Sequence, residues 1–204
     1  DAAAAIVDSG GVAMALALDV CDPDSVQSAL AAFTAAHGHI DGLVNNAGVN
    51  NPGLLVSTDL DAYRQMLDVN LMGPIVCTRA AIGHMLRRRQ GVIVFISSVA
   101  AERPFRGQAV YAATKGGVEA FTRAVAVEYA KKGIRAVCLR AGAIDTDMLA
   151  AARVLGEDEL LARTLLKRIA AADEMAEHVA FLLSDRACYM TGSCVTVDGG
   201  YLQA

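Results

Sequence analysis

The sequence lacks an excess of positive charge and lacks any long apolar run. Its 204 residues carry a formal net charge of -4, so there is no basic stripe that would neutralise a nucleic-acid backbone. The apolar runs, such as residues 91–96, fall far short of the roughly 20 residues that a membrane-spanning helix needs. These absences exclude nucleic acid and membrane as expected partners and predict a soluble protein.

The sequence also lacks paired cysteines and a cluster of metal ligands. Its five cysteines are widely spread and contain no CxxC pair: Cys21, Cys77, Cys138, Cys188 and Cys194. Each lies in an apolar or strand-like stretch, which predicts buried, reduced thiols and a cytoplasmic location. His37 and His39 form an HxH pair, but no carboxylate or cysteine cluster accompanies them, so we expect no metal site.

The sequence does have the composition of a globular domain, and its predicted strands alternate with predicted helices as in a layered α/β domain. With 54% hydrophobic and 20% charged residues, residues 1–204 are expected to form a single domain. Strands are predicted at 13–20, 40–44, 91–96, 134–139 and 194–197, and helices at 24–36, 60–89, 110–131, twice within 148–169, and at 173–184. Apolar strands separated by amphipathic helices are typical of a parallel sheet covered on both faces. The sequence therefore predicts a doubly wound, Rossmann-like fold.

The strongest chemical signal is a tyrosine followed four residues later by a lysine. Tyr111 and Lys115 lie on a predicted helix, so their side chains share one face. An ammonium about 4 to 5 Å from a phenol lowers the pKa of the phenol by roughly 2 to 3 units at an effective dielectric near 20. Such a phenol serves as the base when an alcohol is oxidised and as the acid when a ketone is reduced. The spacing also arises by chance, as a surface tyrosine beside a solvated lysine.

Polar residues follow two of the predicted strands. Ser97 and Ser98 end the strand at 91–96, and the run Asn45–Gly48 ends the strand before it. Ligands of open α/β sheets bind at the carboxyl ends of the strands. We therefore expect both groups to face one crevice.

Together these motifs resemble the short-chain dehydrogenase/reductase family. The resemblance rests on the NNAG run at 45–48, Asn70 in the long helix, Ser98 thirteen residues before Tyr111, the YxxxK pair, and the closing VDGG at 197–200. It covers essentially the whole chain. It implies an oxidoreductase that transfers a hydride between NAD or NADP and a small secondary alcohol or ketone.

The resemblance also implies roles for particular residues. Tyr111 is expected to be the acid/base, Lys115 to lower its pKa and bond the nicotinamide ribose, and Ser98 to polarise the substrate carbonyl. Both Tyr111 and Lys115 would contact the cofactor. The other expected site residues are Asn70, on a water-linked proton path; Asp19 and Val20, at the adenine; Asn45, Ala47 and Gly48, at the nicotinamide-side strand end; and Ile144 and Thr146, at the carboxamide and phosphates. Taken singly, Ser98 is also typical of a strand-end cap, Asn70 of a satisfied helix residue and Gly48 of a turn.

Two departures from the family pattern affect these expectations. Ala141 stands where the family usually has proline, which questions the rigidity of the loop after the strand at 134–139. The chain opens inside what resembles the second helix, with no glycine-rich turn before Asp19. We therefore expect an N-terminally incomplete domain, and a fragment beginning at Asp1 is expected neither to fold cooperatively nor to bind dinucleotide. Preference between NAD and NADP is unreadable, because the residue that sets it lies on the second strand of the family.

Other functions remain open at this point. A non-catalytic scaffold of the same fold would have lost Ser98, Tyr111 or Lys115, and all three are present. An inactive truncated fragment is a second alternative. An epimerase or dehydratase would call for a further substrate domain. Arg103 and Arg106, in the loop before Tyr111, are either solvated charges or contacts to a carboxylate or an acidic carrier.

The two long helices also predict self-association. The helices at 60–89 and 110–131 are apolar over more than one stripe, which indicates a second buried face. The apolar residues concerned are Ile75, Val76, Ala80, Ala81, Val118, Phe121, Ala124 and Val125. The family resemblance implies a homotetramer with a four-helix contact through these two segments.

Overall fold

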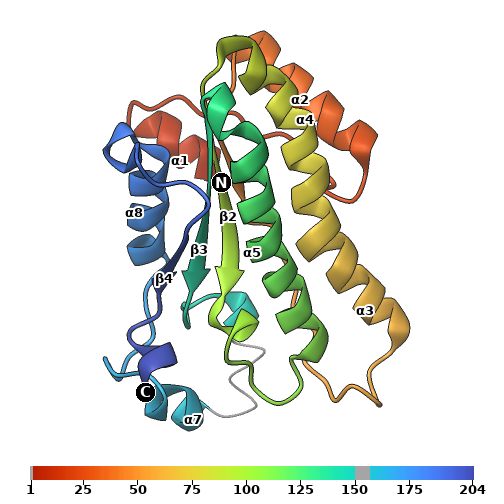
Figure 1. Ribbon diagram of the computed structural model, residues 1–204, viewed down its shortest axis with the longest axis vertical. Coiled ribbons are helices and arrows are strands. Elements are labelled where there is room, and N and C mark those ends of the chain that lie inside the picture. The colour runs from red at the N-terminus through yellow and green to blue at the C-terminus, as the bar shows by residue number, and fades with distance from the viewer. Residues whose placement is uncertain (1, 150–156) are drawn as a thin grey trace.

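The computed structural model, which describes residues 2–149 and 157–204, contains a four-stranded parallel sheet (Figure 1). The strands are β1 Gly42–Asn45, β2 Gly91–Ser98, β3 Ile134–Ala141 and β4 Cys194–Val197, in that order across the sheet. The registers pair Asn45 with Phe95, Ser98 with Ala141, and Ala141 with Val197. The carboxyl ends of the strands therefore lie along one edge of the sheet.

Helices alternate with the strands along the chain. They are α1 Ala2–Asp8, α2 Pro23–His37, α3 Leu60–Leu67, α4 Gly73–Arg88, α5 Ala109–Tyr129, α7 Glu157–Ala162 and α8 Ala172–Leu183. Local sequence signals set several ends. Asp22 caps α2 by accepting a hydrogen bond from the Asp24 amide, and Pro23 needs no amide partner in the first turn. Gly133 has φ of 80° just before β3, where a side chain would collide with the Arg89 carbonyl.

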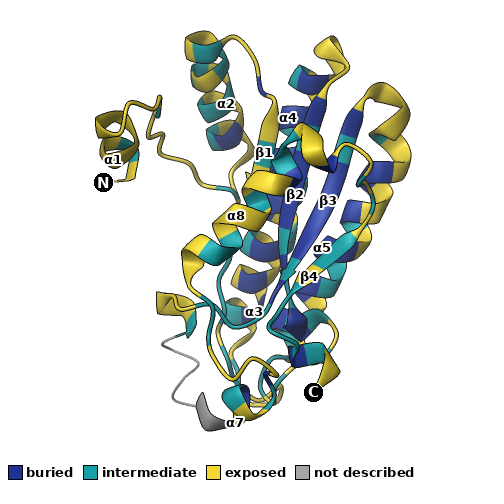
Figure 2. Ribbon diagram, turned by 90° about the vertical axis from the view of Figure 1, so that its left-hand side faces the viewer, coloured by how far each residue is buried: buried dark blue, intermediate teal, exposed yellow. Residues whose placement is uncertain are grey.

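Alternate residues of the central strands are buried on opposite faces of the sheet. Ile93 and Phe95 pack with α4 and α5, whereas Val94 and Val137 pack with α8, where Leu182 is buried. Figure 2 shows the buried strands between α8 and α5. Full burial of each such side chain is worth roughly 1.5 to 3 kcal/mol. The expected doubly wound α/β fold is confirmed, with helices on both faces of a parallel sheet.

The strand predicted at 13–20 is wrong. Residues 11–19 form neither helix nor strand, and Val12, Met14 and Leu18 are exposed. Figure 2 shows this segment leading away from the sheet to α1, which has no buried residue. A parallel strand exists only where a neighbour supplies its hydrogen bonds, and in the described part of the chain the only neighbour of β1 is β2. An apolar stretch alone is therefore not enough to form a strand.

The single helix predicted at 60–89 is instead three consecutive segments. Between α3 and α4 lies a π-helical turn, η1 Asp68–Met72, in which the Gly73 amide donates to the Asp68 carbonyl. Pro74 has no amide hydrogen, so it cannot donate to the Asn70 carbonyl as an α-helix would require. The bonding pattern therefore widens at Asn70. This break was predictable from Pro74.

Other sequence expectations need smaller corrections. Of the two helices expected within 148–169, α7 is the one that lies wholly inside the described residues; residues 150–156 fall outside them, and residues 163–169 are not helical. All five cysteines are free, but Cys21 and Cys188 are exposed rather than buried, and Cys194 is half-buried. Both lie in turns, Cys21 before α2 and Cys188 at the end of the 3-10 turn η4 Asp185–Ala187. None of the described helices is long and apolar enough to cross a membrane.

Candidate active site

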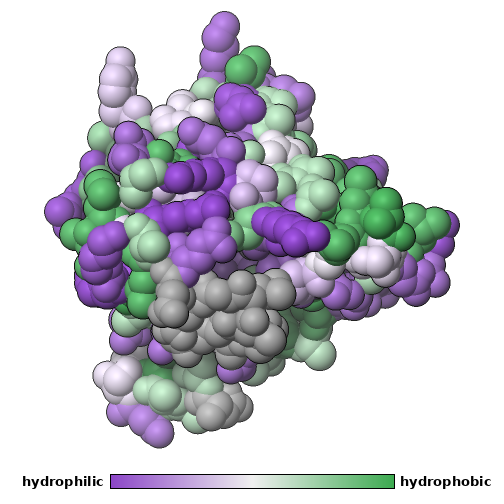
Figure 3. All heavy atoms as spheres, turned by 90° about the horizontal axis from the view of Figure 1, so that it is seen from below, coloured by the Kyte–Doolittle hydropathy of each residue, from purple (hydrophilic) through white to green (hydrophobic). Residues whose placement is uncertain are grey.

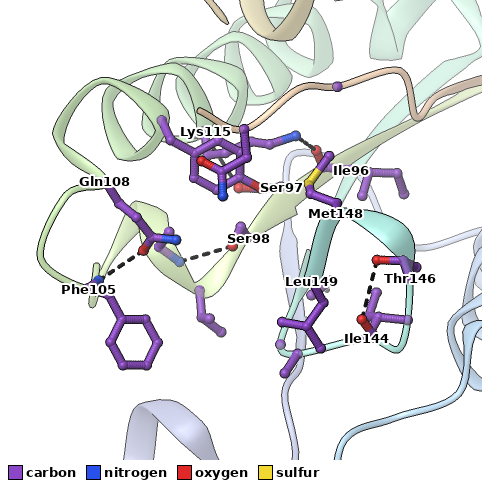
Figure 4. Close-up of a pocket in the computed structure, with 18 of the residues that line it drawn as sticks. Ile96, Ser97, Ser98, Phe105, Gln108, Lys115, Ile144, Thr146, Met148 and Leu149 are labelled. Carbon is purple, nitrogen blue, oxygen red and sulfur yellow. Dashed lines mark hydrogen bonds between the residues drawn. The ribbon is translucent and has the colours of Figure 1, made fainter. Parts of the chain in front are cut away.

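The carboxyl ends of β1, β2 and β3 border a cavity of about 490 Å³. Figure 3 views the molecule from the side at which the strands end, where hydrophilic and hydrophobic side chains both reach the surface. The cavity brings together most of the predicted site residues: Ala47, Gly48, Ser98, Tyr111, Lys115, Ile144 and Thr146. Figure 4 shows Ser98 and Lys115 on one side of this cavity and Ile144 and Thr146 on the other.

Tyr111 lies near the start of α5 and is 8% exposed. It packs with Tyr63, Met66 and Ala100. Burial raises the pKa of Tyr111, and a hydrogen bond with Ser98 opposes that shift. The Ser98 hydroxyl also accepts a hydrogen bond from the Ala100 amide at 3.2 Å, so it caps the turn after β2 as well as contacting the phenol.

Lys115 is one turn further along α5 and is also buried. Its Nζ donates to the Ile96 carbonyl at 2.8 Å and lies 5.7 Å from the centroid of the Tyr111 ring. Burial lowers the pKa of Lys115 to about 8, because the charged form loses its hydration. In this structure the pKa of Tyr111 is raised, because burial of the phenol outweighs the hydrogen bond with Ser98. The role of Lys115 in lowering that pKa stays a prediction.

Asn70 holds the loop after β1 against α5. Its Oδ1 accepts from the Val49 amide at 2.8 Å, and its Nδ2 donates to the Val49 carbonyl at 2.8 Å and to Thr114 at 3.3 Å. A methyl group built at Gly48 would lie 3.5 Å from Asn70 Oδ1 and 3.6 Å from Lys115 Nζ. The Gly48 backbone is therefore close to both residues, although Asn70 does not itself line the cavity.

Three predicted cofactor contacts lie outside the cavity. Asn45 is buried and donates to Thr78 Oγ1 on α4 at 3.2 Å. Asp19 bonds within the turn before α2, accepting from the Cys21 amide at 2.9 Å, and Val20 packs at Gly73. Cavity contacts neither support nor exclude their assigned roles, which stay predictions.

The loop after β3 is held in place despite the alanine at position 141. The Gly142 amide donates to the Val197 carbonyl at 2.9 Å, and a side chain at Gly142 would meet the Asp198 backbone at 2.6 Å. Beyond it, Ile144 forms a parallel bridge with Ala170. These backbone contacts fix the loop without the family's proline.

Several cavity residues were not found from the sequence. They come from loops, from helical segments after β3 and from the chain end: Asn50, Pro52, Phe105, Gln108, Met148, Leu149, Leu160 and Tyr201. Tyr201 reaches the site through Arg103, which donates to the Tyr201 carbonyl at 2.9 Å and also bonds the Ala204 carbonyl. A contact between positions 98 apart in the sequence leaves no local signal.

One cluster of potential metal ligands lies next to the site. The ligand atoms of Glu119, Cys138 and Cys194 lie within 4.8 Å of one another. Arg140 Nε and one terminal nitrogen bond the two Glu119 oxygens, each at 2.8 Å, and Ser97 donates to the same carboxylate at 2.9 Å. A guanidinium on both oxygens opposes a second cation. We therefore assign the cluster to packing and ion pairing.

The comparisons with known proteins agree with this geometry. A family model described as enoyl-(acyl carrier protein) reductase matches residues 1–202. Cis-4-hydroxycyclohexanecarboxylate dehydrogenase of Sinomonas cyclohexanicum is 36% identical over 202 residues, which make up 98% of this chain and 81% of that protein. The inactive 2-(S)-hydroxypropyl-CoM dehydrogenase 2 of Xanthobacter autotrophicus is 37% identical over 204 residues, with coverage of 96% and 88%.

Among solved structures, a gluconate 5-dehydrogenase from Burkholderia cenocepacia in complex with NADP and tartrate superposes with a TM-score of 0.93. It is 32% identical, and the match covers 100% of this chain and 80% of that one. This chain belongs to the short-chain dehydrogenase/reductase family. It is thus a member of an oxidoreductase family that uses NAD or NADP.

Proposed function

We propose that the protein interconverts a small secondary alcohol and the corresponding ketone, with Tyr111 as the acid/base. The observation that carries this proposal is the meeting of two hydroxyls and one unpaired cation in a single cavity. Tyr111 and Ser98 are in hydrogen-bond contact, and Lys115 lies beside them without a carboxylate partner among the described residues. Such a set can bind a carbonyl oxygen and deliver a proton to it.

In the direction of reduction, each side chain has a separate task. The Ser98 hydroxyl donates a hydrogen bond to the ketone oxygen and orients it. Tyr111, whose raised pKa keeps the phenol protonated at neutral pH, gives its proton to that oxygen. The Lys115 ammonium stabilises the phenolate that is left. When bound, the cofactor supplies the hydride for the carbonyl carbon, and in the reverse direction Tyr111 takes the proton back.

The residues present fit the nicotinamide end of the cofactor. The Gly48 backbone approaches Lys115 closely, and Lys115 offers a buried ammonium whose protons are not all used by Ile96. We propose that Lys115 and Tyr111 bond the nicotinamide ribose, that Asn45, Ala47 and Gly48 line the ring, and that Ile144 and Thr146 hold the carboxamide and phosphates. We assign Asp19 and Val20 to the adenine, and we treat the chain as one NAD(P)-binding domain.

A non-catalytic role is the competing hypothesis, since one close relative is named as inactive. The test is ketone-dependent oxidation of NADH or NADPH by the purified full-length protein, with a reaction without ketone as the control. We expect turnover with at least one cofactor. A protein that binds either dinucleotide but shows no turnover with any ketone of a broad panel would support the scaffold hypothesis instead.

We also propose that the protein self-associates into a homotetramer through the segment α3–α4 and through α5. Three residues of the expected second face, Ala81, Val118 and Val125, are in fact buried in the core. The exposed apolar residues that support the proposal are instead Val127, 83% exposed on α5, and Leu60 and Leu67 on α3. Light scattering at micromolar concentration tests it, and a monomer would contradict it.

The five free thiols support a reducing, cytoplasmic location.

A further inference from the structure

One polar atom in the wall of the cavity has no partner in the protein. Asn50 lines the cavity, and its Oδ1 is buried without a hydrogen bond to any described residue. Buried amide oxygens are nearly always satisfied, because the cost of leaving one unpaired exceeds the gain from making the bond. A hydroxyl of a bound molecule suits this position. It both donates and accepts, so it satisfies the buried end of the amide in either orientation of the side chain.

The charged residues of the cavity wall are all cationic. Arg103, Arg106 and Lys115 line it, and no aspartate or glutamate is among the described lining residues. Arg103 is already bound to the carbonyls of Tyr201 and Ala204, and Lys115 belongs to the acid/base centre. Arg106 is exposed, and its side chain forms neither an ion pair nor a hydrogen bond with a described residue. Arg106 therefore has all its donors available for an anion.

The loops that carry these two residues are joined. The Gly53 amide donates to the Gly107 carbonyl at 2.9 Å. Gly107 has φ of 88°, and a side chain there would lie 3.3 Å from the Gly53 nitrogen. This close approach of two backbones fixes the loop after Gly48 against the loop before Tyr111. Asn50 and Arg106 thus belong to one continuous wall of the cavity.

We propose that Asn50 and Arg106 select a ketone that carries both a hydroxyl and a carboxylate beyond the reacting carbon. Asn50 bonds the hydroxyl, and Arg106 bonds the carboxylate. The inference rests on the proposed function, since it names the substrate class of the same site. It assigns the cationic wall to a small hydroxylated acid rather than to an acidic carrier protein.

Four ketones separate the two contacts. A ketogluconate carries hydroxyls and a carboxylate, fructose carries hydroxyls only, levulinate carries a carboxylate only, and methyl propyl ketone carries neither. With the better of the two cofactors, we expect the wild-type protein to show its highest kcat/KM on the ketogluconate. Arg106→Ala should lower kcat/KM at least about tenfold for both acids, mainly through KM, and leave both neutral ketones within about threefold.

Asn50→Ala should give the complementary pattern. We expect a loss of at least about tenfold for the two hydroxylated ketones and little change for levulinate and methyl propyl ketone. Asn51→Ala and Arg79→Ala are matched controls, because both residues are exposed and neither lines the cavity. An unchanged KM for the cofactor shows that each variant is folded, and Asn50→Ser provides a second, smaller change.

The outcomes separate this proposal from the function on which it rests. Two results would overturn the substrate class but leave the ketone reductase activity in place. One is an equal loss of kcat/KM on all four ketones in Arg106→Ala and Asn50→Ala. The other is a preference of the wild-type protein for methyl propyl ketone. Preference for a ketoacyl group on an acidic carrier over all four would also overturn it. Failure to reduce any ketone would instead reject the proposed function.

Discussion

Two neighbouring turns of α5 each carry a buried charged side chain, and only one of these charges has a partner of opposite sign. At Glu119, the carboxylate is bound by Arg140 through two hydrogen bonds of 2.8 Å and by Ser97. Burial alone would raise the pKa of Glu119, but the hydrogen bonds from Arg140 and Ser97 outweigh it and lower that pKa. One turn earlier, Lys115 Nζ hydrogen-bonds the Ile96 carbonyl and has no carboxylate partner among the described residues, and burial lowers its pKa to about 8.

The difference separates a structural charge from a chemical one. Lys115 and Glu119 are four apart, a spacing at which they would otherwise pair. Because Glu119 bonds Arg140 on β3 instead, Lys115 keeps its charge unpaired beside Tyr111. A charge that is fully paired stabilises one arrangement, whereas an unpaired buried charge costs stability and is available to a ligand or a proton transfer. Removing the charge should therefore raise the free energy of unfolding at Lys115 and lower it at Glu119.

The largest expected effect is that of Lys115→Met. Removing the ammonium should lower ketone turnover about 100- to 10,000-fold, because the phenolate loses its neighbouring cation. The same change should raise the free energy of unfolding at pH 7 by about 1 to 3 kcal/mol, since an unpaired buried charge is replaced by an apolar side chain of similar length. Turnover assays and chemical denaturation measure the two effects. A variant that is both inactive and less stable would place Lys115 among the structural charges.

Glu119→Gln should lower the free energy of unfolding. The substitution leaves the mostly buried Arg140 side chain with a neutral partner on its buried side and with the more exposed Glu102 as its remaining carboxylate. We expect a loss of about 2 to 4 kcal/mol of unfolding free energy. Glu102→Gln is the matched control, because Glu102 bonds the same guanidinium but is 58% exposed. Its removal should cost less than about 1 kcal/mol. Similar losses in the two variants would mean that burial does not distinguish these ion pairs.

The smallest effect is the pH dependence of stability. The pKa of Lys115 is 10.5 in the unfolded chain and about 8 in the folded protein, so between these values the unfolded state binds more protons. Stability therefore rises with pH across this window, and the penalty is fully present below pH 8. The advantage of Lys115→Met over wild type should accordingly shrink by about 1 to 3 kcal/mol from pH 8 to pH 10.5. Parallel stability curves for the two proteins would contradict the lowered pKa.

The layered fold could be read from the sequence because its signals are local. Apolar strands, helix caps such as Asp22 and Pro23, and the terminating Gly133 each act within a few residues. The strand at 13–20 failed because a strand also requires a partner, which no local pattern reveals. The break at Asn70 also has a local cause, because Pro74 has no amide hydrogen to donate to the Asn70 carbonyl.

The site was predictable only in part for a similar reason. Tyr111, Lys115 and Ser98 follow from helix spacing and strand ends, and the structure places them together. The direction of the pKa shifts of Tyr111 and Lys115 did not follow, because it depends mainly on burial rather than on the distance between two side chains. Asn50 and Tyr201 reach the cavity through loop and chain-end contacts that sequence spacing does not encode.

The most direct test of the account is a comparison of Tyr111→Phe with Tyr129→Phe in ketone reduction. Both residues lie on α5, but only Tyr111 lines the cavity. The account predicts that Tyr111→Phe lowers kcat about 100- to 10,000-fold with cofactor affinity nearly intact, whereas Tyr129→Phe stays within about threefold of wild type. Activity of Tyr111→Phe within about tenfold of wild type would show that another group transfers the proton.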